Sequence, residues 1–185
     1  MQSRIPRQST NDQATHGTDD DPRLDAESAA ALAAARRRAV RDGDRQIDTA
    51  HLLHSLLEHD PRVRAVFGDG PQLARLLGYL VQRSIGYGLR WQSGVEDSGA
   101  LPVVPLVEGF SPLAAAALEQ ACGRRAGPRV RGLELLAAIV TDRQARAVEV
   151  LTHAGVDVYE LRALIDETLA APQSAEYASG PEPAF

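Results

Sequence analysis

Three histidines and one glutamate lie close together in the chain and could bind a metal ion. His51 and His54 are one helical turn apart, and Glu58 and His59 follow within the same predicted helix. Imidazole and carboxylate groups are common zinc ligands. A zinc site normally needs a third ligand that faces the same point, and this spacing offers none. We therefore expect no metal and no other cofactor.

Few residues have the types and spacing that catalysis needs. Ser55 has no base and acid placed to activate it, and Cys122 falls on the apolar stripe of a predicted helix, where a thiol behaves as a small hydrophobe. All 20 basic residues are arginine, so a phosphate loop of the form GxxxxGK[ST] is excluded. We expect a protein that is not an enzyme and has no catalytic residues.

The elements that position these residues occur twice. The stretch 47–57 recurs at 130–140, and in each copy a branched residue stands two places before a small residue that suits a helix start. A leucine-rich stripe follows, typical of a helix that is buried along one broad face. The branched residues are Ile47 and Val130, and the small residues are Thr49 and Gly132. The two helices are predicted to form the cores of two repeats.

Local signals complete four helices in each repeat. The first helix is predicted over 25–41, with one face made by Leu32, Ala35, Ala39 and Val40. Cap residues followed by proline predict two further starts, and a last helix begins at a capping aspartate. These starts are Asp60-Pro61, Ser111-Pro112 and Asp157. Gly155, just before the last helix, is predicted to adopt a left-handed conformation.

The sequence therefore predicts an all-α protein with two tandem four-helix repeats. The first repeat covers 24–85 and the second covers 110–170, with a glycine- and proline-containing connector at 86–109. The ends of the chain, 1–23 and 171–185, have the polar composition of disordered tails.

Composition limits the cellular setting. The chain has 185 residues, a net charge of −5 and 44% apolar residues, and its N-terminus has no apolar segment typical of a signal peptide. No apolar run approaches the roughly 18 residues of a membrane-spanning helix. A single cysteine fits a reducing compartment. We expect a cytoplasmic protein with no membrane partner.

Arginine clusters suggest an alternative function. The first cluster lies beside Asp42 and Asp44 and is interpreted as a solvated helix face. The second lies partly in a loop where it could contact phosphate, so an arginine-mediated nucleic-acid-binding helical protein is the alternative, although the acidic net charge argues against it. The first cluster comprises Arg36, Arg37, Arg38 and Arg41, and the second comprises Arg124, Arg125, Arg129 and Arg131.

Two motifs resemble a known family, the N-terminal domain of the Clp-family AAA+ unfoldases, which consists of two four-helix repeats. The first motif is Ile47-Asp48-Thr49-Ala50-His51-Leu52-Leu53, and the second is Phe110-Ser111-Pro112. The resemblance covers 24–169 and excludes the ATPase rings. It implies a stand-alone module that binds proteins or peptides, such as Clp ATPase or protease components or their substrates. We predict an adaptor, decoy or regulator linked to Clp-dependent proteolysis.

The resemblance also implies where a partner docks. In the family, the ligand surface lies where the start of each repeat's first helix meets the cap of its second. In this chain those positions are Leu24, Asp25 and Thr49 in one repeat and Phe110, Ser111 and Glu134 in the other. Phe110 is either a docking residue or a hydrophobic anchor for the connector.

Some relatives bind phosphoarginine through a glutamate in each repeat and a basic residue on its first helix. The glutamate positions are Ala50 and Leu133 in this chain, and the basic positions are Ala29 and an alanine near Ala115. Neither repeat offers the carboxylate that would pair with a guanidinium. We expect phosphoarginine to bind poorly.

Overall fold

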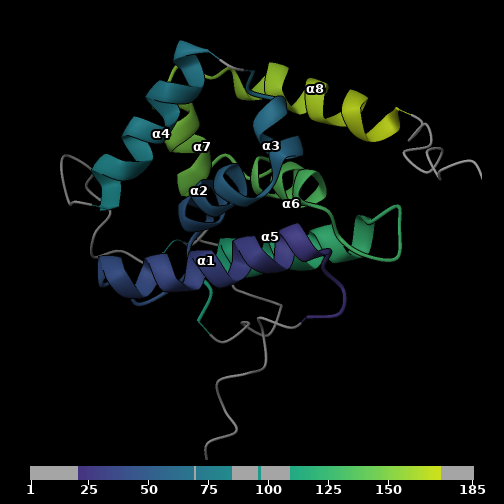
Figure 1. Cartoon of the computed structure of the whole chain (residues 1–185), viewed down its shortest axis with the longest axis horizontal. Coiled ribbons are helices and arrows are strands. Elements are labelled where there is room, and N and C mark those ends of the chain that lie inside the picture. Colours follow the sequence, from purple (N-terminus) through teal and green to yellow (C-terminus); the bar gives the residue numbers. More distant parts are fainter. Residues whose placement is uncertain (1–20, 69, 85–95, 97–108, 172–185) are drawn as a thin grey trace, which may run out of the picture.

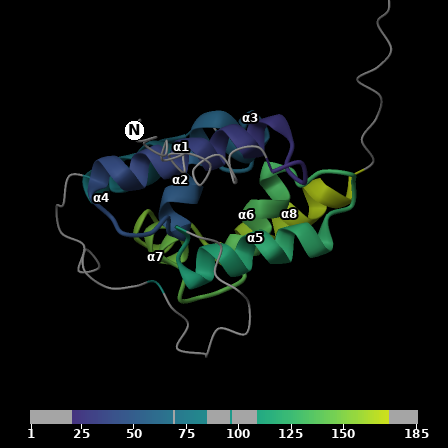
Figure 2. The same cartoon turned by 90° about the horizontal axis from the view of Figure 1, so that it is seen from below.

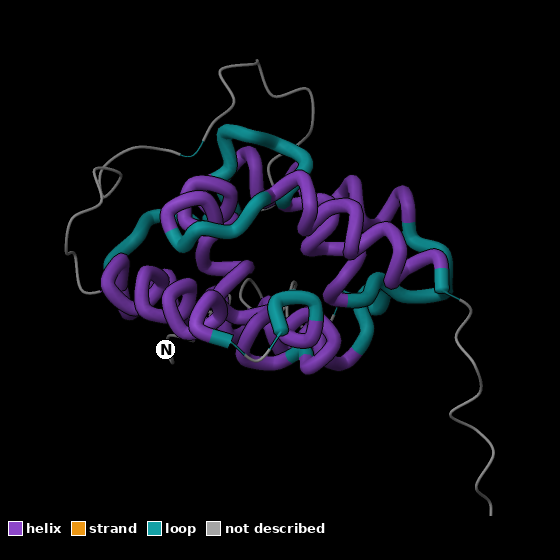
Figure 3. Tube along the Cα trace, turned by 90° about the horizontal axis from the view of Figure 1, so that it is seen from above, coloured by secondary structure: helices purple, strands orange, loops and turns teal. Residues whose placement is uncertain are grey.

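The computed structural model describes residues 21–68, 70–84, 96 and 109–171. Within these residues the chain forms eight helices and no strand. Figure 3 shows the helices and the loops that join them. This confirms the predicted all-α class of two four-helix repeats. The predicted tails lie almost wholly outside the described residues, and so does the connector apart from Glu96 and Gly109. The helices are α1 (Ala26–Asp42), α2 (Thr49–His59), α3 (Pro61–Ala65), α4 (Pro71–Ser84), α5 (Pro112–Arg124), α6 (Gly132–Ile139), α7 (Arg146–His153) and α8 (Val158–Ala170).

Side-chain caps begin several helices where the sequence predicts them. Asp60, Ser111 and Asp157 each accept hydrogen bonds from backbone N–H groups in the first turn of α3, α5 and α8. Such bonds satisfy donors that the helix itself leaves unpaired. Gly155, ahead of α8, has a left-handed φ of 79°, as predicted.

The predicted starts of the two core helices are one residue too late. Thr49 and Gly132 are the first helical residues, and the N-caps are Asp48 and Arg131. Asp48 Oδ1 accepts a hydrogen bond from the backbone N–H of His51 at 2.9 Å. Thr49 lies one residue too far along the chain to cap the helix in this way. The cap bond reaches three residues ahead, and that spacing fixes the true helix start.

The two core helices are buried more completely than one broad face would allow. Every residue of α2 from Thr49 to Leu57 is buried, and so is every residue of α6 except Ala137. The polar residues of α2 are therefore enclosed with its leucines. Helices from both repeats surround α2 and α6, so these two helices form the centre of the molecule.

The predicted apolar face of α1 is correct except at Val40. Leu32, Ala35 and Ala39 are buried, whereas Val40 is 75% exposed. A residue one position after Ala39 is turned by about 100° around the helix axis, which moves its side chain off the buried stripe. Val40 therefore lies on the same outer side as the exposed Arg37.

The helices are arranged in three levels. Figure 1 shows α2, α6 and α7 in the middle, with α1 and α5 on one side and α4 and α8 on the other. Seen from below in Figure 2, α1 and α5 lie apart on the near face. Within each repeat the first helix packs on the second, while α3 contacts α6 and α7 contacts α2 across the repeats. The two repeats therefore share one core.

Backbone pairing also crosses between the repeats. Leu24 forms an isolated parallel bridge with Val130, and Ile47 forms the equivalent bridge with Phe110. The Asp25 N–H donates to the Val130 carbonyl at 2.9 Å, and the Ser111 N–H donates to the Ile47 carbonyl at 2.9 Å. The segment before the first helix of each repeat is thus held by the segment before the second helix of the other repeat.

Candidate protein-binding site

The structure brings the six predicted docking residues together in a different grouping. Leu24 and Asp25 meet the cap of α6, near Glu134, and Phe110 and Ser111 meet the cap of α2, near Thr49. The resemblance placed each start with the cap of its own repeat. The crosswise bridges account for the difference. They form two corners, and at each corner the start of one repeat's first helix meets the cap of the other repeat's second helix.

Most of these six residues are not accessible to a partner. Leu24, Thr49, Phe110, Ser111 and Glu134 are all buried, and Asp25 is half-buried at the N-cap of α1. Phe110 is only 1% exposed and lies in the core cluster, which fits the anchor interpretation of this residue. The polar members use their oxygens to cap helices or to bind neighbouring groups. A role in docking stays a prediction for this set.

An open groove lies beside α8, close to one of these two corners. It has a cavity volume of about 250 Å³, and we call it the α8 groove. Its lining comes from α3, from the start of α6 and from the C-terminal half of α8. The lining residues are Asp60, Arg62, Ala65, Val66, Arg131, Leu133, Leu164, Thr168 and Leu169. Leu164 is 42% exposed and lies in this lining. The groove therefore offers an apolar surface that a partner can reach.

Two arginines border the α8 groove and link it to predicted docking residues. The Arg62 guanidinium is 3.6 Å from Asp25 Oδ2 and about half exposed. The Arg131 guanidinium is 3.2 Å from Glu134 Oε1, and the Arg131 N–H donates to Glu134 Oε2 at 2.8 Å. Hydrogen bonds to Arg131 and to the backbone of Ala126 lower the pKa of Glu134 against the opposing effect of its burial. Glu134 is therefore a charged cap that orients Arg131.

A second depression, of about 360 Å³, lies between α5 and the loop after α6. It is lined by Thr49 together with small and polar residues such as Ala116, Gln120 and Asp142. Its large apolar side chains, Leu113 and Ile139, are buried, so it has no exposed apolar residue comparable to Leu164. We therefore regard the α8 groove as the better candidate for protein binding.

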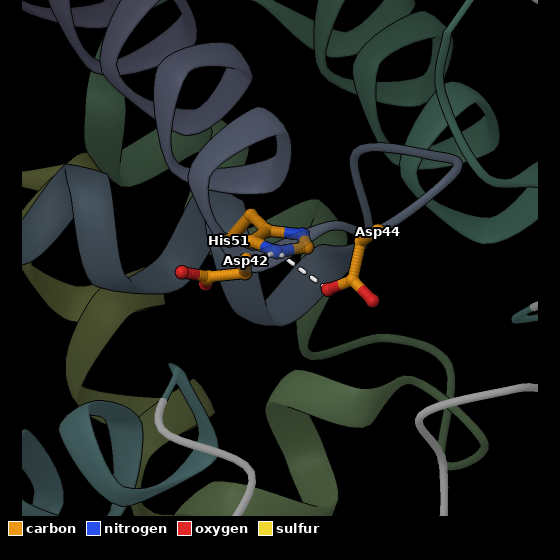
Figure 4. A group of neighbouring side chains, drawn as sticks. All are labelled: Asp42, Asp44 and His51. Atoms are coloured by element: carbon orange, nitrogen blue, oxygen red, sulfur yellow. Dashed lines mark ion pairs between the residues drawn. The ribbon is translucent and has the colours of Figure 1, made fainter.

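His51 lies beside acidic residues, but not those that the sequence suggested. Its Nε2 is 3.0 Å from Asp44 Oδ2 and 3.8 Å from Asp42 Oδ2, as Figure 4 shows. Its Nδ1 accepts a hydrogen bond from the Asp48 N–H at 3.1 Å, which places the proton of a neutral ring on Nε2, facing Asp44. A metal would need the lone pair of that nitrogen. His51 therefore acts as part of the cap of α2 through Nδ1, and its Nε2 faces Asp44.

His54 and His59 do not join that cluster. His54 Nε2 is 3.5 Å from Glu58 Oε1, and His59 Nδ1 is 2.9 Å from the Ser55 carbonyl oxygen. Burial, aided by the nearby Arg38 guanidinium, lowers the pKa of His54 from 6.5 to about 4. His54 is therefore neutral at pH 7, inside the core helix.

The positions that would bind phosphoarginine in some relatives carry neither the acidic nor the basic side chain. Ala50 is fully buried, Ala115 is 3% exposed and Leu133 is 6% exposed. Leu133 contributes an apolar wall to the α8 groove, where a glutamate would place a charge. The groove is therefore suited to an apolar group rather than to a guanidinium.

The second arginine cluster is divided by the fold. Arg124, Arg125 and Arg129 are exposed in and beside the loop that joins α5 to α6, whereas Arg131 is engaged with Glu134. The Arg125 guanidinium donates to the Cys122 carbonyl at the end of α5. The exposed arginines therefore form a short patch on one loop, and no helix presents them as a row.

Comparison with known proteins identifies the fold. No family model matches the chain, and no curated protein matches it. A solved structure does: the N-terminal domain of the caseinolytic protease associated chaperone ClpD from Arabidopsis thaliana. The match has a TM-score of 0.57 and 20% sequence identity, and it covers 80% of this chain and 96% of that chain. The chain has the Clp N-terminal domain fold.

The Clp N-terminal fold accounts for the order of the eight helices and confirms the architecture expected from the two sequence motifs. At 20% identity the likeness extends to the fold and no further. Within the described residues, no helix is long and apolar enough to cross a membrane.

Proposed function

We propose that this chain is a protein-binding module that docks a partner's peptide segment in the α8 groove and acts as an adaptor, decoy or regulator in Clp-dependent proteolysis. The fold supports the protein-binding class, because Clp N-terminal domains are non-catalytic modules that bind substrates. The single observation that carries the site is an accessible apolar groove bordered by two arginines.

The lining of the α8 groove indicates the chemistry of its ligand. Leu133, Leu164 and Leu169 would receive an apolar side chain, and burying such a side chain contributes about 1.5–3 kcal/mol to binding. Arg62 lies at the border with its guanidinium about half exposed, so it can pair with a carboxylate of the same peptide, whereas Arg131 is held by Glu134. The preferred segment therefore combines a large apolar residue with a neighbouring acidic residue.

The experiment measures binding of purified Clp ATPase and protease subunits from the same source by calorimetry. Leu164→Asp places a charge in the groove at a position that is 42% exposed, so it should preserve folding. Val40→Asp introduces the same charge at an exposed position on α1 and serves as the control. We expect wild type and Val40→Asp to bind alike and Leu164→Asp to bind at least about tenfold more weakly, a difference of about 1.4 kcal/mol.

The possible failures have different meanings. If no Clp component binds wild type, the link to Clp proteolysis is wrong. If a component binds wild type and Leu164→Asp equally, with melting curves that show both proteins folded, the partner docks elsewhere and the groove assignment is wrong. The alternative of nucleic-acid binding is distinguished by repeating the binding measurement at higher salt. Binding to nucleic-acid phosphates weakens steeply as the salt concentration rises, whereas binding in an apolar groove does not.

A further inference from the structure

One carboxylate from the connector is buried at the point where three helices begin. Glu96 is 4% exposed, although it belongs to the segment between the two repeats. The three helices are α2 of the first repeat and α5 and α7 of the second. We call the place where they converge the three-helix corner, and define it by Thr49, Ser111 and Arg146.

Each oxygen of the Glu96 carboxylate accepts two hydrogen bonds. Oε1 accepts from the Arg146 N–H at 2.7 Å and from the Thr49 hydroxyl. Oε2 accepts from the Thr49 N–H at 2.9 Å and from the Ser111 hydroxyl at 2.6 Å. All four donors come from N-cap or first-turn residues. Backbone N–H groups at a helix start are otherwise unpaired, so the carboxylate satisfies donors in both repeats.

The electrostatic field of the corner also favours an anion. A helix N-terminus carries a partial positive charge, and here the starts of three helices, of 11, 13 and 8 residues, face one group. The hydroxyls are themselves held in place: the Thr49 hydroxyl accepts from the Ala147 N–H at 3.1 Å, and the Ser111 hydroxyl accepts from the Ala114 N–H at 3.2 Å. Accepting these bonds directs their protons toward Glu96.

From this geometry we infer that the three-helix corner is a carboxylate-binding site and that Glu96 is its intramolecular ligand. Two oxygens in one plane match the two pairs of donors, which favours formate or acetate over the larger, tetrahedral phosphate. The site differs from the α8 groove in residues and position, so it does not depend on the proposed function. Removing the Glu96 carboxylate leaves the donors in place to bind a carboxylate from solution.

The test uses the full-length chain with Glu96→Ala and titrates formate, acetate and phosphate against chloride at constant ionic strength. Melting curves report stabilisation, and amide NMR shifts of Thr49 and Arg146 report the place of binding. We expect formate to raise the melting temperature of Glu96→Ala in a saturable manner and to shift both amides. Wild type should bind formate at least about tenfold more weakly, because its own carboxylate is present at high effective concentration.

Two controls separate the site from general effects of charge. Glu149→Ala removes an exposed carboxylate from the first turn of α7, so it makes the same charge change on a helix that reaches the corner. It should gain no formate binding. Glu96→Gln fills the corner with a neutral group of the same shape and should likewise gain none.

Several results would overturn the inference. One is that wild type and Glu96→Ala bind formate with equal strength. Another is that a folded Glu96→Ala protein binds no anion, and a third is that it binds phosphate but not formate. Should Glu96→Ala fail to fold in chloride, formate is expected to restore its helical spectrum, and a failure to do so would also overturn it.

Discussion

Ile47 and Phe110, from different repeats, are joined by a parallel bridge in which the Ser111 N–H donates to the Ile47 carbonyl at 2.9 Å. Both side chains are buried, at 3% and 1% exposure, although each precedes the helix it introduces. The bridge ties the start of α5 to the start of α2. Its equivalent between Leu24 and Val130 ties α1 to α6, so each repeat helps to fix helix starts of the other.

Phe110→Ala should be strongly destabilising. The ring fills part of the shared core, and truncating a buried phenylalanine costs about 3–5 kcal/mol of unfolding free energy. Denaturant unfolding followed by circular dichroism measures the change. Val40→Ala, at a 75% exposed position, should stay within about 0.5 kcal/mol of wild type. A Phe110→Ala protein as stable as wild type would contradict the anchoring role.

Gly132→Ala should destabilise the contact between α3 and α6. A Cβ at this position would lie 2.2 Å from Asp60 Oδ2 and 3.0 Å from Val63 Cγ2. Asp60 is fully buried and its other oxygen caps α3, so relieving the overlap disturbs a helix start. We expect a loss of about 1–3 kcal/mol in denaturant unfolding.

The matched change is Gly78→Ala, on an exposed part of α4 where a Cβ would meet nothing within 4 Å. Alanine favours a helix over glycine, so this variant should gain up to about 1 kcal/mol. Equal effects of the two substitutions would show that helix propensity, and not the close approach to Asp60, controls position 132.

Stability should fall in mild acid because of His54. Its folded-state pKa is about 4, below the ordinary 6.5, because burial disfavours the charged ring. Between pH 4 and pH 6.5 the His54 ring binds a proton more readily in the unfolded chain than in the folded protein. The contribution of His54 to the free energy of unfolding is therefore complete above pH 6.5 and is lost as the pH falls toward 4. The slope for one such group is at most about 1.4 kcal/mol per pH unit.

Urea unfolding at several pH values tests this, with His54→Gln as the comparison. The variant is expected to lose part of the decline between pH 6.5 and 4. An identical pH profile for the two proteins would assign the acid sensitivity to other groups.

Cys122 should react slowly with thiol reagents in the folded protein. It is buried on α5, and burial raises the pKa of its thiol, so little of the reactive thiolate is present at neutral pH. Labelling with a chromogenic disulfide should be much faster after denaturation in urea. Equally fast labelling in the native state would show that α5 opens readily at this position.

Signals confined to a few neighbouring residues were sufficient to predict most of the helices. Ser111-Pro112, Asp60-Pro61 and Asp157 predicted helix starts because a cap bond joins residues two or three positions apart, so its chemistry is visible in the sequence. The start of α2 was misplaced by one residue, although Asp48 and His51 have the spacing of a capping pair. The prediction considered the small size of Thr49 and overlooked its acidic neighbour.

The features that depend on distant contacts could not be predicted in the same way. The repeated motif shows that Ile47 and Val130 are equivalent positions. It does not show whether each residue contacts the first helix of its own repeat or that of the other repeat. The α8 groove needs the relative positions of α3, α6 and α8. Glu96 gave no signal at all, because a lone acidic residue in a connector looks solvent-exposed until the helix starts that surround it are known.

The crosswise bridges have a consequence for how such a chain could arise and be divided. Each repeat completes a corner of the other, which is the reciprocal relationship found across a two-fold axis in a symmetric homodimer. Two separate copies of one four-helix unit could therefore make the same two corners without a covalent link. The chain is therefore organised like a fused dimer, in which the covalent connection keeps the two halves at high local concentration.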